Sequence, residues 1–266
     1  MPNPIFARTR HEYGSYSDFW RLVELSGYST CYVDEIDASD PEKTYIFTPA
    51  NGETANGWQS AKARIIHWLL EWTGDLTGNP PGVAETWVSN RTYATLLGAK
   101  FVVMGSHPGL MFEYAAVPKD KRFDLVHLFY MIPRRERVIN HLLKQSLHIA
   151  PNGWGRERHE SMLHSKLMLN VHQHAEYPAL APLRMALAAA YHLPIVSEDG
   201  WSVEPVERAV LVYPYEQLGQ VVPCLIDPAY EEQLRRKGEQ LHQILCVEHT
   251  FRKCVQAALQ QSFHFR

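Results

Sequence analysis

The sequence predicts an α/β protein with parallel sheets, arranged as two lobes. Short apolar runs typical of buried strands alternate with stretches whose apolar residues recur at helical spacing, which is typical of βαβ units. Residues 106–122 combine Pro, Gly and a charged run, and predict a linker. The length of 266 residues allows one large domain or two small ones. We therefore expect an N-terminal lobe over residues 1–117 and a C-terminal lobe over residues 118–266, with the final helix crossing back to the first lobe.

The elements of the first lobe follow from local patterns. The segment 61–72 has Ile65, Ile66, Leu69 and Trp72 at helical spacing and predicts a helix. A second helix is expected at 91–97, because Asn90 can cap it and Gly98 can end it. Apolar or alternating runs predict strands at 30–36, 44–48, 85–89 and 100–104.

The second lobe shows the alternation of strand and helix more clearly. Its expected strands are 124–130, 147–150, 166–171, 194–197 and 209–213. Its expected helices are 134–146, opened by Pro133, then 181–192, and in the tail 231–245 and 248–260.

Composition excludes several classes of protein. With 45% hydrophobic and 21% charged residues, the chain is neither mainly disordered nor collagen-like nor a coiled-coil rod. No apolar run reaches the roughly 18 residues that a membrane span needs. The first nine residues lack the apolar region of a secretory signal, and the four Cys include no C-x-x-C pair, so we expect reduced thiols and a cytoplasmic protein.

Charge is unevenly distributed along the chain. The net charge is -3, yet residues 134–184 contain eight Lys and Arg against four Asp and Glu, together with six His. A compact anion such as a nucleoside diphosphate suits this segment. The chain has no G-x-G-x-x-G, Walker A, G-x-S-x-G or H-E-x-x-H motif, which weighs against dehydrogenases, P-loop NTPases, α/β-hydrolases and zincins.

Three groups of residues are candidates for a binding site. Arg134 and Arg135 stand where an expected strand turns into a helix, a place that suits phosphate, although a solvated Arg pair is an equal alternative. Asn170 and His172 fall at the carboxyl end of an expected strand, where open α/β sheets bind ligands. Glu198 ends a neighbouring strand and can bind a sugar hydroxyl or act as acid or base, or it is an ordinary loop carboxylate.

The order of these pieces resembles the C-terminal domain of GT-B glycosyltransferases of the group-1-like type. The resemblance covers about residues 124–260. It rests on Arg134-Arg135 at the head of a helix, Asn152-Gly-Trp-Gly155, Ser165-Lys166 followed by Asn170-x-His172, Pro182-x-Arg184, Ser197-Glu198, and Glu248-His-Thr-Phe251. It implies two Rossmann-like lobes of GT-B type, with a shortened N-terminal lobe, and transfer of a hexose-like sugar from a nucleoside-diphosphate sugar.

The resemblance also implies roles for particular residues. The donor diphosphate would lie against Arg134, Arg135, Lys166, Asn170, His172 and Arg184, which supply positive charge without a metal or other cofactor. The acceptor base would come from the first lobe, with His107 ahead of Asp34, Glu35 and Glu53, and Glu198 completes the expected catalytic pair.

One departure from the family leaves the function open. Retaining members carry a Glu that holds the donor ribose, and Leu187 stands at that position here. A non-catalytic protein that binds nucleotide sugars is therefore one alternative. A viral-type transferase that glycosylates modified bases in DNA is another, although the acidic balance argues against a DNA-binding surface.

Overall fold

The structure is a computed structural model of the chain that describes residues 3–10, 16–48, 58–70, 81–111, 118 and 120–261. The chain forms two compact units. The first unit is Met1–Met104 together with Phe251–Arg266, and the second unit is Gly105–Thr250. The division therefore falls just before the segment expected as a linker, and the last helix groups with the first unit. No helix in the described part of the chain is both long and apolar enough to span a membrane.

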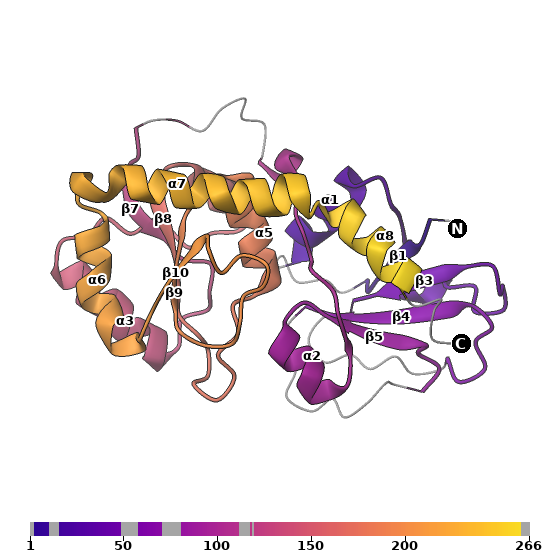
Figure 1. Cartoon of the computed structure of the whole chain (residues 1–266). Helices are drawn as coiled ribbons and strands as arrows, with labels where there is room; N and C mark the ends of the chain where they lie inside the picture. The colour runs from indigo at the N-terminus through magenta and orange to yellow at the C-terminus, as the bar shows by residue number, and fades with distance from the viewer. Residues whose placement is uncertain are drawn as a thin grey trace. The chain divides into compact units, whose positions relative to one another are not determined.

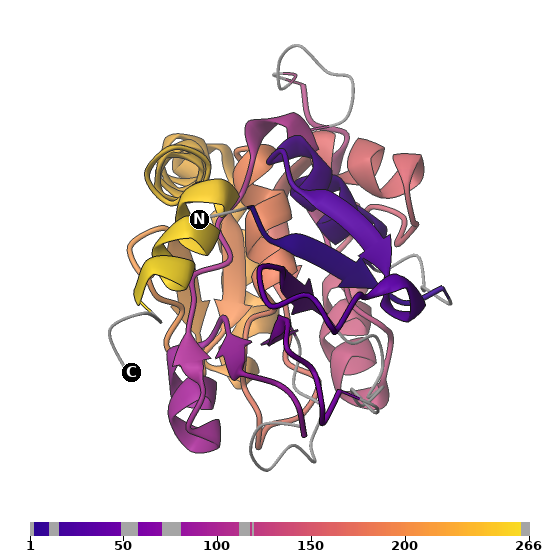
Figure 2. The same cartoon turned by 90° about the vertical axis from the view of Figure 1, so that its right-hand side faces the viewer.

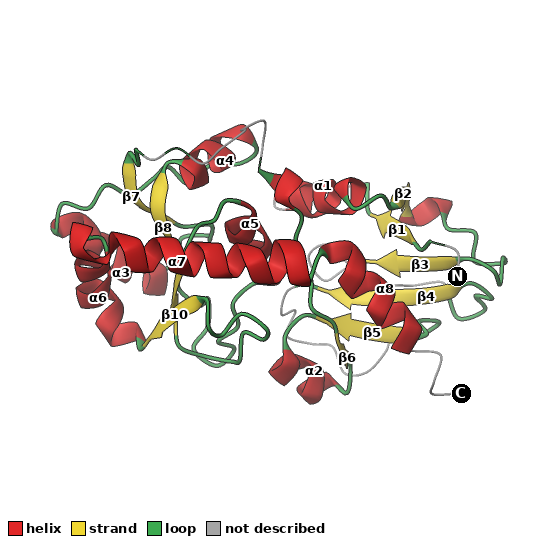
Figure 3. Ribbon diagram, turned by 45° about the horizontal axis from the view of Figure 1, so that its top comes forward, coloured by secondary structure: helices red, strands yellow, loops and turns green. Residues whose placement is uncertain are grey.

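The first unit contains a parallel sheet of six strands in the order β2-β1-β3-β4-β5-β6 (Figures 1 and 3). The strands are β1 Ile5–Arg8, β2 Ser29–Tyr32, β3 Thr44–Phe47, β4 Arg64–Leu69, β5 Glu85–Val88 and β6 Lys100–Phe101. Its helices are α1 Ser17–Leu25, α2 Arg91–Leu97 and α8 Phe251–Gln261, with a short 3-10 turn at Val33–Glu35. Figure 2 shows the same strands after a turn of 90° about the vertical axis.

Aromatic packing joins α8 to this sheet. Phe251 is fully buried, and its ring stacks on Trp68 of β4 with ring centres 5.5 Å apart. Phe6 of β1 and Phe19 of α1 complete the cluster, with ring centres 5.7 and 5.9 Å from that of Phe251. The last described helix therefore supplies core to the unit that holds the first strand.

The prediction of a helix over 61–72 is wrong, because residues 64–69 form the strand β4; residues 71 and 72 are outside the described residues. The strand pairs with β3 on one side and β5 on the other, and Ile65, Ile66 and Trp68 are fully buried. A strand covered on both faces reads as a continuous apolar run rather than an alternating one, and such a run also satisfies helical spacing. Helix α2 agrees with the prediction: Asn90 accepts from the Tyr93 amide, and Gly98 has a positive φ of 62°.

The second unit contains a parallel sheet in the order β10-β9-β8-β7. The strands are β7 Phe123–Val126, β8 Ser165–Asn170, β9 Ile195–Glu198 and β10 Val210–Tyr213. Leu125 of β7 pairs with Leu167 of β8 and also forms a bridge with Ile149. The segment 147–150 therefore lies on the far side of β7 from β8, and the amides of Asp124 and Ala150 also donate across this pair, to the carbonyls of His148 and Leu125.

The helices of the second unit are α3 Pro133–Lys144, α4 Arg156–Leu163, α5 Pro182–Ala190, α6 Leu218–Leu225 and α7 Glu231–His242. A π-helical turn, Gln243–Glu248, follows α7, and 3-10 turns form at Pro108–Leu110, Tyr215–Gln217 and Pro228–Tyr230. Apolar residues of α3 and α6 pack with β7, β8 and β9 in one core cluster. Four of the five expected strands of this half exist, with β7 ending earlier than its pattern suggested, and the fifth, 147–150, forms a bridge to β7 rather than a strand. Helices α4 and α6 were not expected.

Candidate functional site

The candidate site lies where the sheet order of the second unit reverses. From β7 the chain passes to 147–150 on one side and then to β8 on the other. Open α/β sheets bind ligands at such a switch point, outside the carboxyl ends of the strands. The candidates Asn170 and His172 stand at the carboxyl end of β8, and Glu198 ends the adjacent β9.

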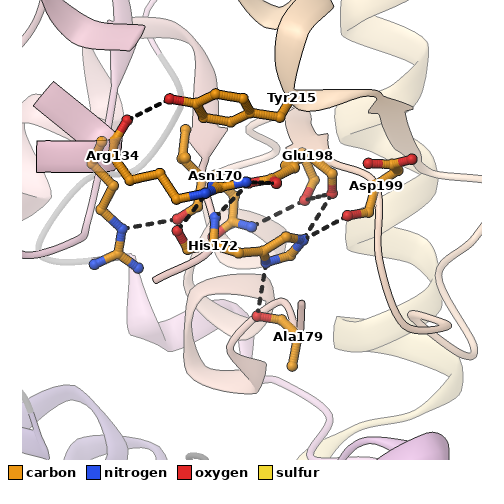
Figure 4. A network of polar contacts seen from close by, with 10 residues as sticks. Arg134, Asn170, His172, Ala179, Glu198, Asp199 and Tyr215 are labelled. Carbon is orange, nitrogen blue, oxygen red and sulfur yellow. Dashed lines mark hydrogen bonds and ion pairs between the residues drawn. The ribbon is translucent and has the colours of Figure 1, made fainter. Parts of the chain in front are cut away.

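An ion pair links α3 to the end of β9 at this edge (Figure 4). Both terminal nitrogens of Arg134 donate to the carboxylate of Glu198, one of them over 2.6 Å. The side chain of Glu198 is 6% exposed and that of Arg134 is 18% exposed. Tyr215 supports the arginine, since its hydroxyl donates to the Arg134 carbonyl over 2.7 Å and its ring lies 4.0 Å from the guanidinium carbon. The Glu198 carboxylate, the Tyr215 hydroxyl and the Tyr215 ring thus hold Arg134 in one orientation.

His172 connects this pair to the neighbouring loops. Its backbone amide donates to Glu198 over 3.0 Å. Its Nδ1 lies 3.2 Å from the Ala179 carbonyl, and its Nε2 lies 3.0 and 3.1 Å from the carbonyls of Glu198 and Asp199 (Figure 4). Burial lowers the pKa of His172, while the Glu198 carboxylate and these carbonyls oppose that shift. Its ring therefore joins the loops after β8 and β9.

Two further arginines join β7 to β8 across the switch point. Arg135 is buried and donates to the carbonyls of Val171 and Tyr130 over 2.9 and 3.0 Å. Arg184, from α5, donates to the Leu128 carbonyl and to the amide oxygen of Asn170 over 3.0 and 2.9 Å. These arginines hold the backbone in place, and they also add positive charge to the edge.

Sequence reasoning missed His127, which directly follows β7. Its ring stacks on Phe129, with centres 4.5 Å apart, and its Nδ1 is buried without a hydrogen-bond partner. Burial, with the nearby charges of Arg184 and Arg135, lowers its pKa to about 4, so it is neutral near pH 7. The apolar pattern placed His127 inside a strand, and only the early end of β7 brings it to the carboxyl edge.

Lys166 lies apart from the other candidates. It is the second residue of β8, near the end opposite Asn170, and its Nζ donates to Asp124 over 2.8 Å. Since strands rise about 3.3 Å per residue, four positions separate it from Asn170 by roughly 13 Å. The structure thus brings together Arg134, Arg135, Asn170, His172, Arg184 and Glu198, and leaves Lys166 outside that group.

The candidates for an acceptor base are scattered. His107 caps a 3-10 turn, and its Nδ1 accepts from the Gly109 amide over 3.0 Å. Its ring proton is then on Nε2, which becomes a donor rather than a base. Asp34 and Glu35 follow β2 in the first unit, and both pair with Arg10, over 2.8 and 3.3 Å. Glu53 is outside the described residues.

Metal-ligand geometry is absent from the described ranges, which hold no group of three His, Cys, Asp or Glu able to share an ion. Two His residues of the second unit make contacts of another kind. His172 faces carbonyls, and His159 contacts the Tyr191 hydroxyl over 2.5 Å.

Two all-parallel sheets in separate units, with the polar edge of the second sheet at its switch point, define the GT-B fold of two Rossmann-like lobes. The fold expected from the sequence is confirmed by solved structures. No protein-family model matches the chain, and no curated protein matches it by sequence.

Three solved structures illustrate the similarity. AviGT4, a glycosyltransferase involved in avilamycin A biosynthesis, is 10% identical, with a TM-score of 0.60 over 98% of this chain and 97% of AviGT4. The T4 phage BGT in complex with its UDP-glucose substrate is 9% identical, with a TM-score of 0.58 over 97% of this chain and 99% of the other. The DNA-modifying enzyme β-glucosyltransferase is 9% identical, with a TM-score of 0.57 over 98% and 100%. At these identities the similarity shows the fold.

Proposed function

We propose that the chain is a glycosyltransferase that moves a sugar from a nucleoside-diphosphate sugar to an acceptor hydroxyl. One observation carries the proposal: an ordered network of three arginines, Asn170, His172 and Glu198 at the switch point of the second sheet. The similarity of the fold to nucleotide-sugar enzymes supports it, because the T4 phage BGT was solved with UDP-glucose.

The chemistry assigned to this edge is stabilisation of the leaving group. The bond from the anomeric carbon to the diphosphate breaks, and a bond from that carbon to the acceptor oxygen forms, while the acceptor proton goes to a base. Arg134, Arg135 and Arg184 gather at this edge, with Glu198, Asp199 and Glu216 as the neighbouring carboxylates, and the guanidinium groups would stabilise the negative charge that develops on the diphosphate. Glu198 is a positioning residue in this scheme, because Arg134 and the His172 amide already occupy its oxygens.

The proposal is tested by nucleotide release. The protein is incubated with uridine, guanosine and cytidine diphosphate sugars, and free nucleoside diphosphate is measured with acceptors of several classes, including duplex DNA with hydroxylated bases. Arg134→Met should weaken donor binding, since a charged hydrogen bond contributes about 1.5–3 kcal/mol. Lys166→Ala is the matched control, because Lys166 lies near the other end of β8, and it should leave donor binding unchanged. Equal loss in both variants would contradict the placement of the donor.

The proposal has two further parts: the reaction needs no metal ion, and the transferred sugar is a hexose. The arginine network already supplies the charge for which other enzymes use a divalent ion. The transfer rate should therefore be unchanged after exhaustive chelation. A chelated protein that is inactive and recovers on addition of manganese would contradict this part. Transfer from pentose donors but not from hexose donors would contradict the assignment of a hexose.

A non-catalytic nucleotide-sugar-binding protein is the second candidate. The observation in its favour is Leu187, which stands in α5 at the position of the family Glu and is 1% exposed. A buried leucine cannot accept hydrogen bonds from a ribose. This candidate is supported if nucleotide sugars raise the melting temperature but no acceptor class stimulates nucleotide release.

A further inference from the structure

Trp154 is an exposed aromatic residue that the network described above does not use. It lies in the loop 151–155, between the segment 147–150 and α4, and it is 47% exposed. Indole combines a large apolar face with one N–H donor, and Trp is for this reason enriched at binding interfaces.

The loop is built to hold this indole in place. The Asn152 amide nitrogen donates to the Phe129 carbonyl over 3.0 Å, and the Ser161 hydroxyl donates to the Pro151 carbonyl over 3.0 Å. Gly155 has a φ of 54° and a ψ of -130°, a conformation that suits glycine alone. Trp154 is therefore carried by a backbone that is fixed on both sides.

A buried arginine covers one face of the ring. The Arg158 guanidinium carbon lies 3.9 Å from the centre of the Trp154 ring, and Arg158 is 5% exposed. A cation at this distance is attracted to the ring face, and it fixes the orientation of the indole. The exposed area of Trp154 is therefore a flat aromatic surface with a preset orientation.

The position of this surface fits the length of a nucleotide. The loop follows 147–150, which is next to β7, whereas Asn170 and His172 follow β8 on the other side of β7. Adjacent strands lie about 4.8 Å apart, so the two strand ends are separated by about 10 Å across the switch point. A ribose and a diphosphate extend over a similar length. A nucleotide whose diphosphate lies at the end of β8 would thus have its base near Trp154.

We infer that Trp154 stacks on the base of the nucleoside diphosphate and is the base-binding residue of the donor site. The inference rests on the proposed function, since it assumes that the diphosphate lies at the Arg134 edge. Stacking on an aromatic ring tolerates every base, because each base has a π face. The ring therefore supplies affinity for a base of any kind, and hydrogen-bonding groups around it determine which base is preferred.

The test separates the base from the diphosphate. Calorimetry measures the affinity of the wild type, Trp154→Ala and Trp154→Phe for uridine, guanosine, cytidine and adenosine diphosphates, and for inorganic pyrophosphate. Trp154→Ala should weaken the tightest nucleoside diphosphate by about 5- to 150-fold, the equivalent of the roughly 1–3 kcal/mol that stacking contributes per base. Trp154→Phe should retain most of the affinity, and pyrophosphate binding should not change in either variant.

Tyr230→Ala is the matched control, because Tyr230 is an exposed aromatic residue of the same unit in a turn that follows no strand. It should bind all ligands as the wild type does. Quenching of tryptophan fluorescence by the nucleotide gives a second readout, and it should disappear in Trp154→Phe even if Trp154→Ala folds poorly.

Three outcomes overturn the inference. They are wild-type nucleotide affinity in Trp154→Ala, equal loss of pyrophosphate and nucleotide affinity, and quenching that persists in Trp154→Phe. In each case the proposed function stands if Arg134→Met still loses the donor. A wild-type protein that binds no nucleoside diphosphate overturns both.

Discussion

Removing the charge of Glu198 should destabilise the second unit strongly. The carboxylate accepts both terminal nitrogens of Arg134 and the His172 amide, and it is 6% exposed. Glu198→Gln keeps the shape of the side chain but leaves the partly buried guanidinium without its counter-charge. Removal of one partner from a buried ion pair costs about 3–5 kcal/mol. Because Arg134 retains some contact with water, we expect about 3 kcal/mol, the lower end of that range.

A double-mutant cycle isolates the pair. Urea unfolding is measured for the wild type, Glu198→Gln, Arg134→Met and the double variant. Each single change should lower the free energy of unfolding, and the double change should cost about 1–3 kcal/mol less than the sum, because neither charge is then left unpaired. Glu232→Gln, in the exposed cluster with Arg235 and Arg236, is the control and should move the midpoint little.

The reasoning is refuted if the single changes are additive, or if Glu198→Gln costs less than about 1 kcal/mol, the upper end for an exposed pair. Either result would mean that solvent reaches the pair freely. It would also remove the argument that Glu198 positions Arg134 for a donor.

Three further predictions concern other parts of the fold. Burial lowers the pKa of His67 to about 4, so the folded chain resists a proton that the unfolded chain accepts near pH 6.5, and stability falls as the pH drops from about 6.5 to 4. In His67→Leu, the free energy of unfolding should fall less with decreasing pH, by up to about 3 kcal/mol between pH 6.5 and pH 4. Thermal unfolding at several pH values measures this, and a pH dependence equal to that of the wild type would contradict the prediction. Gly238→Ala should cost about 1–3 kcal/mol in urea unfolding, because a methyl group on α7 would collide with the His192 carbonyl; a neutral result would show that α7 can shift. Asn170→Ala should lower the melting temperature and weaken donor binding together, since it leaves the Ser197 hydroxyl and Arg184 short of a partner; a change in only one of the two would separate folding from binding.

Local patterns predicted α3 and α5, the two helices that supply arginines to the site, because a proline marks the start of each. Pro133 opens α3 and Pro182 opens α5, and both stand where the sequence placed them. The carboxyl ends of β8 and β9 followed from these positions, and so did the meeting of Asn170, His172 and Glu198. Sheet edges collect residues that are distant in sequence, and a parallel order makes that collection predictable.

The failures have two physical causes. Strand β4 is buried on both faces, so its apolar residues carry no period that distinguishes a strand from a helix. The expected position of Lys166 beside the other donor-binding candidates differs from the structure for another reason. Lys166 stands only four residues before Asn170, but β8 is extended, so four residues cover most of the length of the strand. The two residues therefore lie near opposite ends of β8. The pairing of Arg134 with Glu198 was out of reach of local patterns, because it joins residues 64 positions apart.

The place of Phe251 at the centre of the first unit also sets the order in which the protein can be completed during synthesis. The ring stacks on Trp68 and contacts Phe6 and Phe19, so the core of this unit lacks its central side chain until α8 has left the ribosome. All of the residues 105–250 are translated before that helix, and they form a unit of their own. The nascent chain can therefore fold its second unit before α8 is available, whereas the strands of the first unit, although translated earlier, complete their core only with α8.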